Sequence, residues 1–309
     1  LSPTPFMVGF GLIVLTIFIH WQMRREKQGQ TPLVRMRILQ NGTFLTGITS
    51  NIFQSMVITG MLFVIPLYLQ SASGYSAFES GLAILPFSIA TFAVSLGTAS
   101  WGERMPAKRL IQAGVILMIV GVALFYSVVT VNITIGQMII PLGVFGIGMG
   151  LLMAHLVNLI LSSVSPDDSP EASGVNNTAD QLGNSLGTAI VGSLLMAFFL
   201  GNVVDGVLRY DGIQVSDQER SQIVVALEDA RESITEAERQ AFYDQLPANV
   251  QQQLDQFLDT SVVTAMEDTL LVIGFLLVIM FLLASFLPNR EKRKIPVAER
   301  VPDVSPDVV

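Results

Sequence analysis

The stretch TLLVIGFLLVIMFLLASFL, residues 269–287, decides the fold class of this chain. It contains no charged side chain, and a helix that spans a bilayer needs about 20 mostly apolar residues. Six further runs of this kind precede it in the 309-residue sequence: residues 6–21, 44–68, 81–100, 110–131, 137–162 and 182–201. We therefore predict an all-α integral membrane protein with seven transmembrane helices.

Basic residues in the short connections between these runs fall on alternate connections. By the positive-inside rule these connections face the cytoplasm, which predicts a multi-pass protein of the cytoplasmic membrane with a cytoplasmic C-terminus. Residues 163–180 contain no basic residue, so only helix counting places them on the cytoplasmic side. The basic residues that set the orientation are Arg24, Arg25, Lys27, Arg35, Arg37, Arg104, Lys108, Arg109, Arg290, Lys292, Arg293, Lys294 and Arg300.

The net charge of −8 arises in one segment, residues 202–260. This segment has twelve Asp and Glu residues against four Arg residues, and the difference equals the whole imbalance. No basic stripe suited to nucleic acid remains elsewhere. Capping-box patterns, Ser216 with Glu219 and Thr235 with Glu238, predict short helices in an acidic exocytoplasmic loop. A lid or partner site and a simple insertion tolerated in a loop both fit this segment.

The residue inventory argues against most enzyme chemistry. The chain has no Cys and two His, which removes disulfides, thiol nucleophiles and a zinc site of ordinary ligand number. No clustered nucleophile, base or metal-ligand set is evident in the sequence. We therefore expect a protein that is not an enzyme and that uses no metal or cofactor.

Polar side chains within two apolar runs indicate an interior cavity. Spacings of three and four put Asn51, Gln54 and Ser55 on one helix face and His155 and Asn158 on another. Polar groups at membrane depth are costly unless they face protein or water, so both faces are candidates for a substrate cavity. Hydrogen bonding between helices, without any ligand, is the alternative. The runs 110–131 and 269–287 have almost nothing polar inside, which is typical of peripheral helices facing lipid.

Carboxylates next to the runs have two interpretations. Glu79, Asp180 and the pair Glu267 and Asp268 are expected at helix N-termini, where a negative charge is stabilised by the helix dipole. The alternative is a role in transport, and Glu79 and Asp180, with the neighbouring Gln181, are our candidates for a gate or a cation contact.

Glycine pairs one helical turn apart predict close helix packing. Gly146 and Gly150 lie in the fifth run, and Gly183 and Gly187 lie in the sixth. Small residues at this spacing let two helix backbones approach each other in a membrane. A dinucleotide-binding loop is excluded for the fifth run, because no strand precedes it.

Two motifs resemble a known family. Residues 65–86, IPLYLQSASGYSAFESGLAILP, and residues 171–192, EASGVNNTADQLGNSLGTAIVG, resemble the second-half signature of the fourteen-helix drug:proton antiporters of the major facilitator superfamily. The long exocytoplasmic loop before the last run is similar to theirs as well. Asp180 is a departure, because relatives often have Arg at this position.

A third stretch, GTASWGERMPAKR at residues 97–109, resembles the superfamily's cytoplasmic loop motif. Pro106 stands where the family usually has Gly. The resemblance implies a charge-paired latch between helices, which an exposed ion pair of about 0 to 1 kcal/mol suits. The motif positions are Gly97, Glu103, Arg104, Lys108 and Arg109.

The resemblance also implies a domain organisation. Residues 1–22 would be a transmembrane helix that links two halves, and residues 23–43 a cytoplasmic linker. Residues 44–201 and 261–288 would form a C-terminal six-helix domain of two inverted three-helix repeats. Residues 202–260 would be the exocytoplasmic loop, and residues 289–309 a disordered cytoplasmic tail. The N-terminal half of the transporter would be missing from this sequence.

The function implied is proton-coupled export of amphipathic or cationic compounds by alternating access. The expected partners are the lipid bilayer, the missing N-terminal half, a small amphipathic substrate and protons. A dedicated exporter of one metabolite, lipid or siderophore shares the same fold. From a different class, a non-transporting membrane subunit or receptor could bind a partner through residues 202–260.

Overall fold

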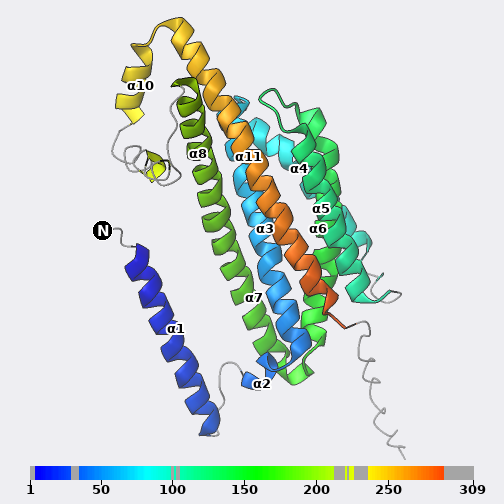
Figure 1. Ribbon diagram of the computed structural model, residues 1–309. Coiled ribbons are helices and arrows are strands. Elements are labelled where there is room, and N and C mark those ends of the chain that lie inside the picture. The colour runs from blue at the N-terminus through cyan, green and yellow to red at the C-terminus, as the bar shows by residue number, and fades with distance from the viewer. Residues whose placement is uncertain are drawn as a thin grey trace, which may run out of the picture.

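The computed structural model describes residues 4–28, 35–98, 101, 105–211, 220, 223–225 and 236–288. All regular structure in this part of the chain is helical. The long helices run side by side as a bundle, while α1 stands apart from it (Figure 1). The helices are α1 (Thr4–Lys27), α2 (Met36–Leu39), α3 (Gly42–Ala72), α4 (Ala77–Gly97), α5 (Ala107–Val128), α6 (Ile135–Ser162), α7 (Ser169–Leu186), α8 (Gly192–Asp211), α10 (Glu236–Asp244) and α11 (Ala248–Ser285).

Six membrane-spanning helices confirm six of the seven predicted runs. They are α3, α4, α5, α6, α11 and one long helix over Pro166–Val207, which is continuous through α7, the π-helix Gly187–Val191 and α8. The first run forms α1, but its apolar stretch, Gly9–Gln22, is too short to count with the others. The prediction of an all-α membrane protein is therefore confirmed for six spans.

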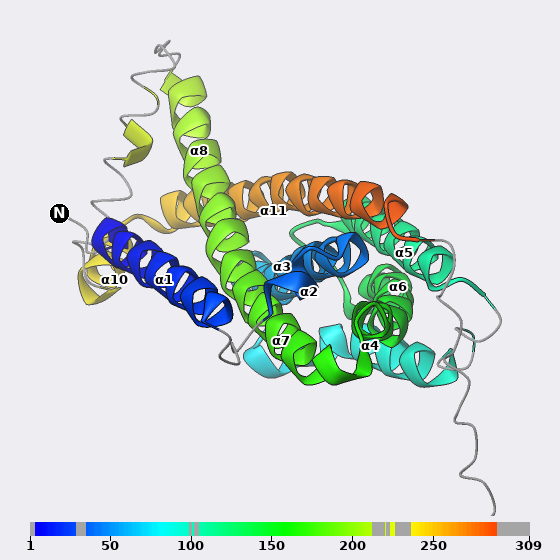
Figure 2. The ribbon, with the colours of Figure 1, turned by 90° about the horizontal axis from the view of Figure 1, so that it is seen from below.

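Glycines let the central helices approach each other at backbone distance. An added Cβ at Gly146 or Gly150 would lie 2.5 and 2.7 Å from the carbonyl oxygens of Phe87 and Thr91 on α4. On another face of α6, a Cβ at Gly148 would meet the carbonyl oxygen of Gly114 on α5. As a result α6 lies between α4 and α5, which Figure 2 shows from below.

Of the carboxylates expected at helix N-termini, one lies there and the others do not. Ser76 and Glu79 form a capping box at the start of α4, so Glu79 lies at a helix N-terminus as expected. The same expectation is wrong for the other carboxylates. Asp180 is the twelfth residue of α7, and Glu267 and its neighbour Asp268 lie about midway along α11. Both helices begin with polar residues that a search for apolar runs passes over.

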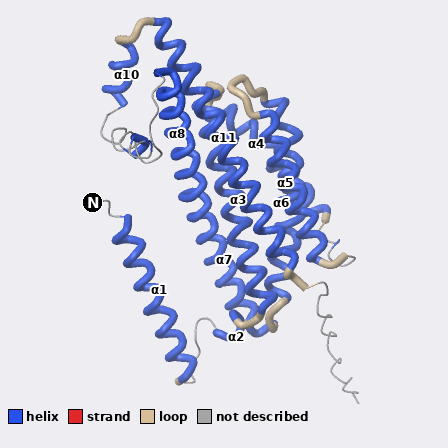
Figure 3. Tube along the Cα trace, in the orientation of Figure 1, coloured by secondary structure: helices blue, strands red, loops and turns tan. Residues whose placement is uncertain are grey.

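The connections between helices sort to two ends of the bundle (Figure 3). At one end the hydroxyl of Tyr68 donates to the carbonyl oxygen of Thr130 at 2.6 Å, and that of Tyr75 donates to Ile133 at 2.8 Å. At the other end Asn41, before α3, donates through Nδ2 to the carbonyl oxygen of Ser163 at 2.6 Å. Residues 163–168 therefore lie at the same end as the basic segment 35–41.

The acidic segment 202–260 is partly an extension of the spanning helices. α8 continues to Asp211 and α11 already begins at Ala248, with Pro247 at its N-cap. Between them α10 starts one residue after Thr235, and Tyr243 donates to Asp255 of α11 at 2.7 Å. That hydrogen bond raises the pKa of the Tyr243 hydroxyl. The expected capping box at Ser216 and the tail 289–309 lie outside the described residues.

Candidate functional site

A row of polar side chains joins α3 to α7 within the bundle. Asn51 Nδ2 donates to Asp180 Oδ1 at 2.8 Å, and Ser55 Oγ donates to the same oxygen at 2.9 Å. Thr59 Oγ1 donates to Asn184 Oδ1 at 2.7 Å, one turn further along both helices. Asn51 also donates to Asn176 Oδ1 at 3.1 Å. We call this set the polar seam: Asn51, Ser55 and Thr59 of α3 with Asn176, Asp180 and Asn184 of α7.

The spacing of four on each helix creates the polar seam. Residues i, i+4 and i+8 lie on one face of an α-helix, so each helix presents a single polar stripe. Two glycines bring the stripes together, because an added Cβ at Gly183 would lie 2.5 Å from the carbonyl oxygen of Ile52. At Gly187 it would lie 2.5 Å from that of Met56. The π-helix Gly187–Val191 follows directly, and such bulges are frequent at functional sites.

The polar seam joins two helices that are long and apolar enough to span a membrane. At about 1.5 Å rise per residue, α3 is roughly 46 Å long, and Asn51 and Ser55 lie roughly 13 and 20 Å from its start. A hydrocarbon core of about 30 Å centred on α3 would enclose both side chains. Asn51 is 1% exposed and Ser55 5% exposed, while Asp180 is half-buried.

The other predicted cavity residues are not members of the polar seam as defined above. Gln54 is buried on α3, and its Oε1 has no hydrogen-bond partner among the described residues. His155 is buried on α6. Asn158 is exposed and donates to the carbonyl oxygen of Ala154 in its own helix at 2.9 Å, and Gln181 is exposed on α7.

Sequence reasoning missed Asn176 and Asn184 as site residues. The signal was present, because Asn176, Asp180 and Asn184 repeat every four residues. It becomes visible only once residues 169–186 are known to form a helix, because the apolar run itself begins at residue 182. The polar half of α7 resembles a connection in the sequence.

The residues of the cytoplasmic loop motif are only partly described. Gly97 ends α4, and Glu103 and Arg104 lie outside the described residues. Lys108 Nζ donates to the carbonyl oxygen of Ser285, the last residue of α11, and Gln112 Nε2 donates to Ser285 Oγ at 3.2 Å. A cation at a helix C-terminus is stabilised by the helix dipole. Lys108 therefore ties α5 to the end of α11.

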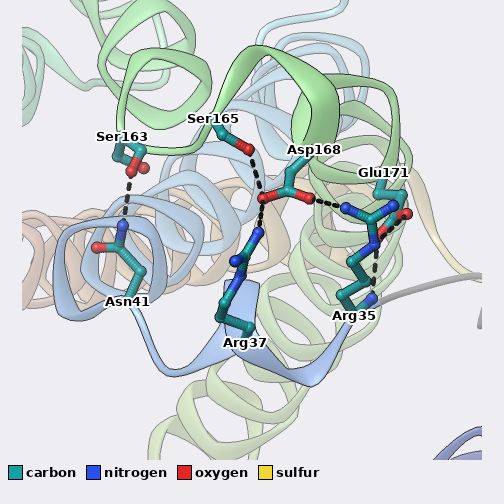
Figure 4. Close-up of polar contacts among 7 residues, drawn as sticks. All are labelled: Arg35, Arg37, Asn41, Ser163, Ser165, Asp168 and Glu171. Atoms are coloured by element: carbon teal, nitrogen blue, oxygen red, sulfur yellow. Dashed lines mark hydrogen bonds and ion pairs between the residues drawn. The ribbon is translucent and has the colours of Figure 1, made fainter. Parts of the chain in front are cut away.

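A second charged cluster, not anticipated from sequence, joins the segment before α3 to the start of α7 (Figure 4). Arg35 Nη1 lies 2.6 Å from Asp168 Oδ1, and Arg37 Nη2 lies 2.8 Å from Asp168 Oδ2. Ser165 Oγ donates to Asp168 Oδ2 at 2.6 Å, and the backbone N–H of Arg35 donates to Glu171 Oε2 at 2.9 Å. We call these five residues the linker clamp.

Burial within the linker clamp is unequal. The Asp168 side chain is 5% exposed, whereas those of Arg35 and Arg37 are 39% and 71% exposed. A buried charge that loses its partners is costly, while an exposed charge can be hydrated by water. The stability of the ionised Asp168 side chain therefore depends on its contacts with Arg35 and Arg37.

This inequality gives a prediction for the thermal stability of the purified protein. Replacing both arginines, Arg35→Ala with Arg37→Ala, is expected to lower the Tm by several degrees, because the buried carboxylate loses both cations. Asp168→Asn is expected to lower it less, because the arginines remain solvated. Arg24→Ala, an exposed arginine of α1, is the control and should change nothing. Equal losses for the double arginine variant and Asp168→Asn would contradict this account of the clamp.

A bundle of six helices that are long and apolar enough to span a bilayer defines a multi-pass membrane protein. The sequence profile described as Major Facilitator Superfamily matches residues 4–188, more than half of the chain. The chain belongs to the Major Facilitator Superfamily.

Curated relatives of the chain include bacterial proteins named for transport, multidrug efflux or antibiotic resistance. A probable actinorhodin transporter of Streptomyces coelicolor is 24% identical over 92% of this chain and 53% of its own length. The multidrug efflux pump LfrA of Mycolicibacterium smegmatis is 27% identical over 62% of this chain and 37% of its own length. The lincomycin resistance protein LmrB of Listeria monocytogenes is 25% identical over 60% and 39%. The chain thus spans about half the length, or less, of these relatives.

A solved structure shows the same fold. It is a bacterial homologue of the human lysosomal transporter Spinster, crystallised in an inward-facing and unoccupied conformation. The TM-score is 0.57 at 15% sequence identity, and the match covers 82% of this chain and 50% of that protein. The family and its neighbours are transporters rather than enzymes, which is consistent with the expectation from sequence.

Proposed function

We propose that this chain is the C-terminal half of a proton-coupled efflux transporter of the fourteen-helix antiporter type, exporting amphipathic or cationic compounds. The observation that carries the proposal is the polar seam, a set of hydrogen-bonding groups at membrane depth in a chain of this superfamily. Such groups mark substrate and ion pathways in membrane proteins. Alternating access would come from rocking this domain against an N-terminal half around a shared cavity.

The packing pattern supports an arrangement of two inverted three-helix repeats. In such an arrangement α3, α4 and α5 would correspond to α6, the α7–α8 helix and α11. The contacts agree with this correspondence. The first helix of each repeat packs on the second and third helices of the other repeat: α6 packs on α4 and α5, and α3 packs on α7 and α11. Glycines form the close contact in each corresponding pair: Gly146 and Gly150 between α6 and α4, Gly183 and Gly187 between α3 and α7.

Within this proposal the cavity would be lined from α3 and α6. Asn51, Gln54 and Ser55 on the first helix and His155 and Asn158 on the second remain our candidates for substrate contact. Gln54 Oε1 has no hydrogen-bond partner within the part of the chain that the structure describes, which supports a role in ligand contact. Lys108 and the residues around it would act as the cytoplasmic latch, and Glu79, Asp180 and Gln181 as gate or cation contacts.

A comparison of two kinds of variant tests transport against a receptor role. Gln54→Leu and Asn158→Leu are expected to slow ethidium efflux about tenfold each, the equivalent of one hydrogen bond of roughly 1.4 kcal/mol. Replacing residues 212–247, between α8 and α11, by a flexible Gly-Ser linker should leave efflux near normal. The assay uses cells that express the complete reading frame containing this chain, with protein levels measured.

The matched control is Ser127→Leu, a polar-to-apolar change at an exposed position of α5, which should have no effect. The reverse order of effects would contradict the proposal. If residues 212–247 were essential and the two cavity variants were silent, the chain would be a membrane subunit or receptor that acts through its exocytoplasmic segment.

A further inference from the structure

A cavity of about 560 Å³ lies between α8, α11 and residues 220–225. It is found where α8 and α11 pack on each other, at the level where Asp268 directly precedes the apolar run 269–287. Its volume is in the range of about 300–1,000 Å³ that is usual for small-molecule sites. We call it the outer pocket, because the sequence predicts this end of the bundle to be exocytoplasmic. Its lining includes Phe198, Asn202 and Asp205 from α8, Asp268 from α11, and Arg220 and Val225 between them.

One carboxylate in the outer pocket has no counter-ion. Arg220 is bidentate on Asp205, because its Nε donates to Oδ1 at 2.6 Å and its Nη2 donates to Oδ2 at 2.8 Å. These two charges neutralise each other. In the part of the chain that the structure describes, Asp268 accepts no hydrogen bond and forms no ion pair. The outer pocket therefore carries a net negative charge, and Asp268 is its source.

The remaining lining suits a ligand that is more than a bare charge. Asn202 Nδ2 is shielded from solvent and has no hydrogen-bond partner among the described residues. A buried donor without a partner is costly, so an acceptor on a ligand would be favoured there. Phe198 and Val225 add apolar surface, and an aromatic ring attracts a cation over its face.

A metal ion fits the outer pocket less well than an organic cation. Among the described residues no group of three or more His, Asp or Glu side chains could hold a metal ion. Hard cations such as Ca²⁺ take about six to eight oxygen ligands, whereas this pocket offers one uncompensated carboxylate beside apolar groups.

We propose that the outer pocket binds an organic cation with an apolar body, with Asp268 as its counter-ion. The site is separate from the candidate cavity on α3 and α6, and binding there is not a required step of export. Replacement of residues 212–247, which include Arg220 and Val225, is expected to leave efflux near normal. The outer pocket instead gives part of the acidic segment 202–260 a ligand-binding role.

Protection of an introduced cysteine tests binding at the pocket itself. The chain contains no Cys, so Val225→Cys places a reporter thiol at a lining residue that is 55% exposed. Membranes with the protein from the complete reading frame are treated with N-ethylmaleimide, and mass spectrometry follows alkylation at position 225. Tetraphenylphosphonium in excess over its Kd is expected to slow this alkylation at least about fivefold, because the fraction of unoccupied pockets falls. Ile223→Cys, an exposed position in the same segment, is the control and should be alkylated at an unchanged rate.

Two further comparisons isolate the role of charge. Asp268→Asn, combined with Val225→Cys, should raise the half-protecting concentration about fivefold, the effect of one partly exposed ion pair at the upper end of its usual range. Asp259→Asn removes the same charge from α11 at a position that does not line the pocket, so protection should be unchanged. Triphenylphosphine oxide, a neutral molecule of similar shape, should protect at least about fivefold less well than the cation. Size-exclusion chromatography verifies that each variant is folded.

The proposal is overturned if tetraphenylphosphonium gives no protection at position 225, or protects position 223 equally. It is also overturned if the neutral molecule protects as well as the cation, or if Asp268→Asn leaves the half-protecting concentration unchanged. Labelling needs neither a gradient nor transport. Normal protection in a protein without efflux would therefore support the outer pocket and count against the proposed function alone.

Discussion

Gly183→Ala is expected to destabilise the purified protein by about 1–3 kcal/mol, the usual cost of forcing a methyl group into a well-packed contact. The new Cβ would lie 2.5 Å from the carbonyl oxygen of Ile52 and 2.7 Å from Ser55 Cβ. The first of these is a backbone atom, so a rotamer change cannot relieve the overlap and α3 must move away from α7. That movement would also lengthen the hydrogen bonds from Asn51 and Ser55 to Asp180. Thermal unfolding in detergent, followed by size-exclusion chromatography, measures the loss.

Gly174→Ala is the matched control, because Gly174 lies in the same helix and has no atom within 4 Å of an added Cβ. In an open helical position Ala is favoured over Gly by roughly 0.5–1 kcal/mol. The control should therefore be neutral or slightly stabilising, opposite in sign to Gly183→Ala. If both variants behaved alike, the effect would come from helix propensity, and the close contact between α3 and α7 would be contradicted.

Asn51→Leu is expected to cost about 1.5–3 kcal/mol, the value of a hydrogen bond to a charged group. Asn51 is 1% exposed, and its replacement leaves the Asp180 carboxylate with one short hydrogen bond in place of two. Thermal unfolding of the purified variant measures the loss, and an unchanged stability would contradict the hydrogen bond from Asn51 to Asp180.

The double variant Asn51→Leu with Asp180→Leu separates stability from transport. With both side chains apolar, no carboxylate is left short of a donor, and part of the lost stability should return, although Ser55 and Asn176 lose partners as well. Efflux should stay low, because a gate residue of the proposed function has gone. A double variant that is no more stable than Asn51→Leu alone would show that the two side chains do not interact.

Hydrophobicity determined most of what could be predicted. The bilayer requires each span to be long, apolar and helical, so runs such as 269–287 are visible in any one sequence. Close helix packing at the glycines 146, 150, 183 and 187 could also be predicted, because a spacing of four places each pair on one helix face. Their partners on α4 and α3 could not be predicted, since these contacts depend on tertiary packing.

Polar extensions of the spanning helices were the main source of error. Residues 169–181 of α7 and 248–260 of α11 are polar, so a search for apolar runs placed the helix starts too late. For that reason Asp180 was expected at a helix end, whereas it lies within α7 beside α3. The linker clamp was missed for a related reason: Arg35 and Arg37 were read only as orientation signals, although they bind Asp168 from a distant segment.

The most direct measurement of the central claim is solute accumulation in everted membrane vesicles from cells that express the complete reading frame containing this chain. The account predicts that an acid-inside pH gradient drives ethidium or tetraphenylphosphonium into the vesicles. It also predicts that nigericin, which collapses the gradient, abolishes uptake. Vesicles that contain the folded protein but accumulate no amphipathic cation, or accumulate it equally without the gradient, would contradict the account.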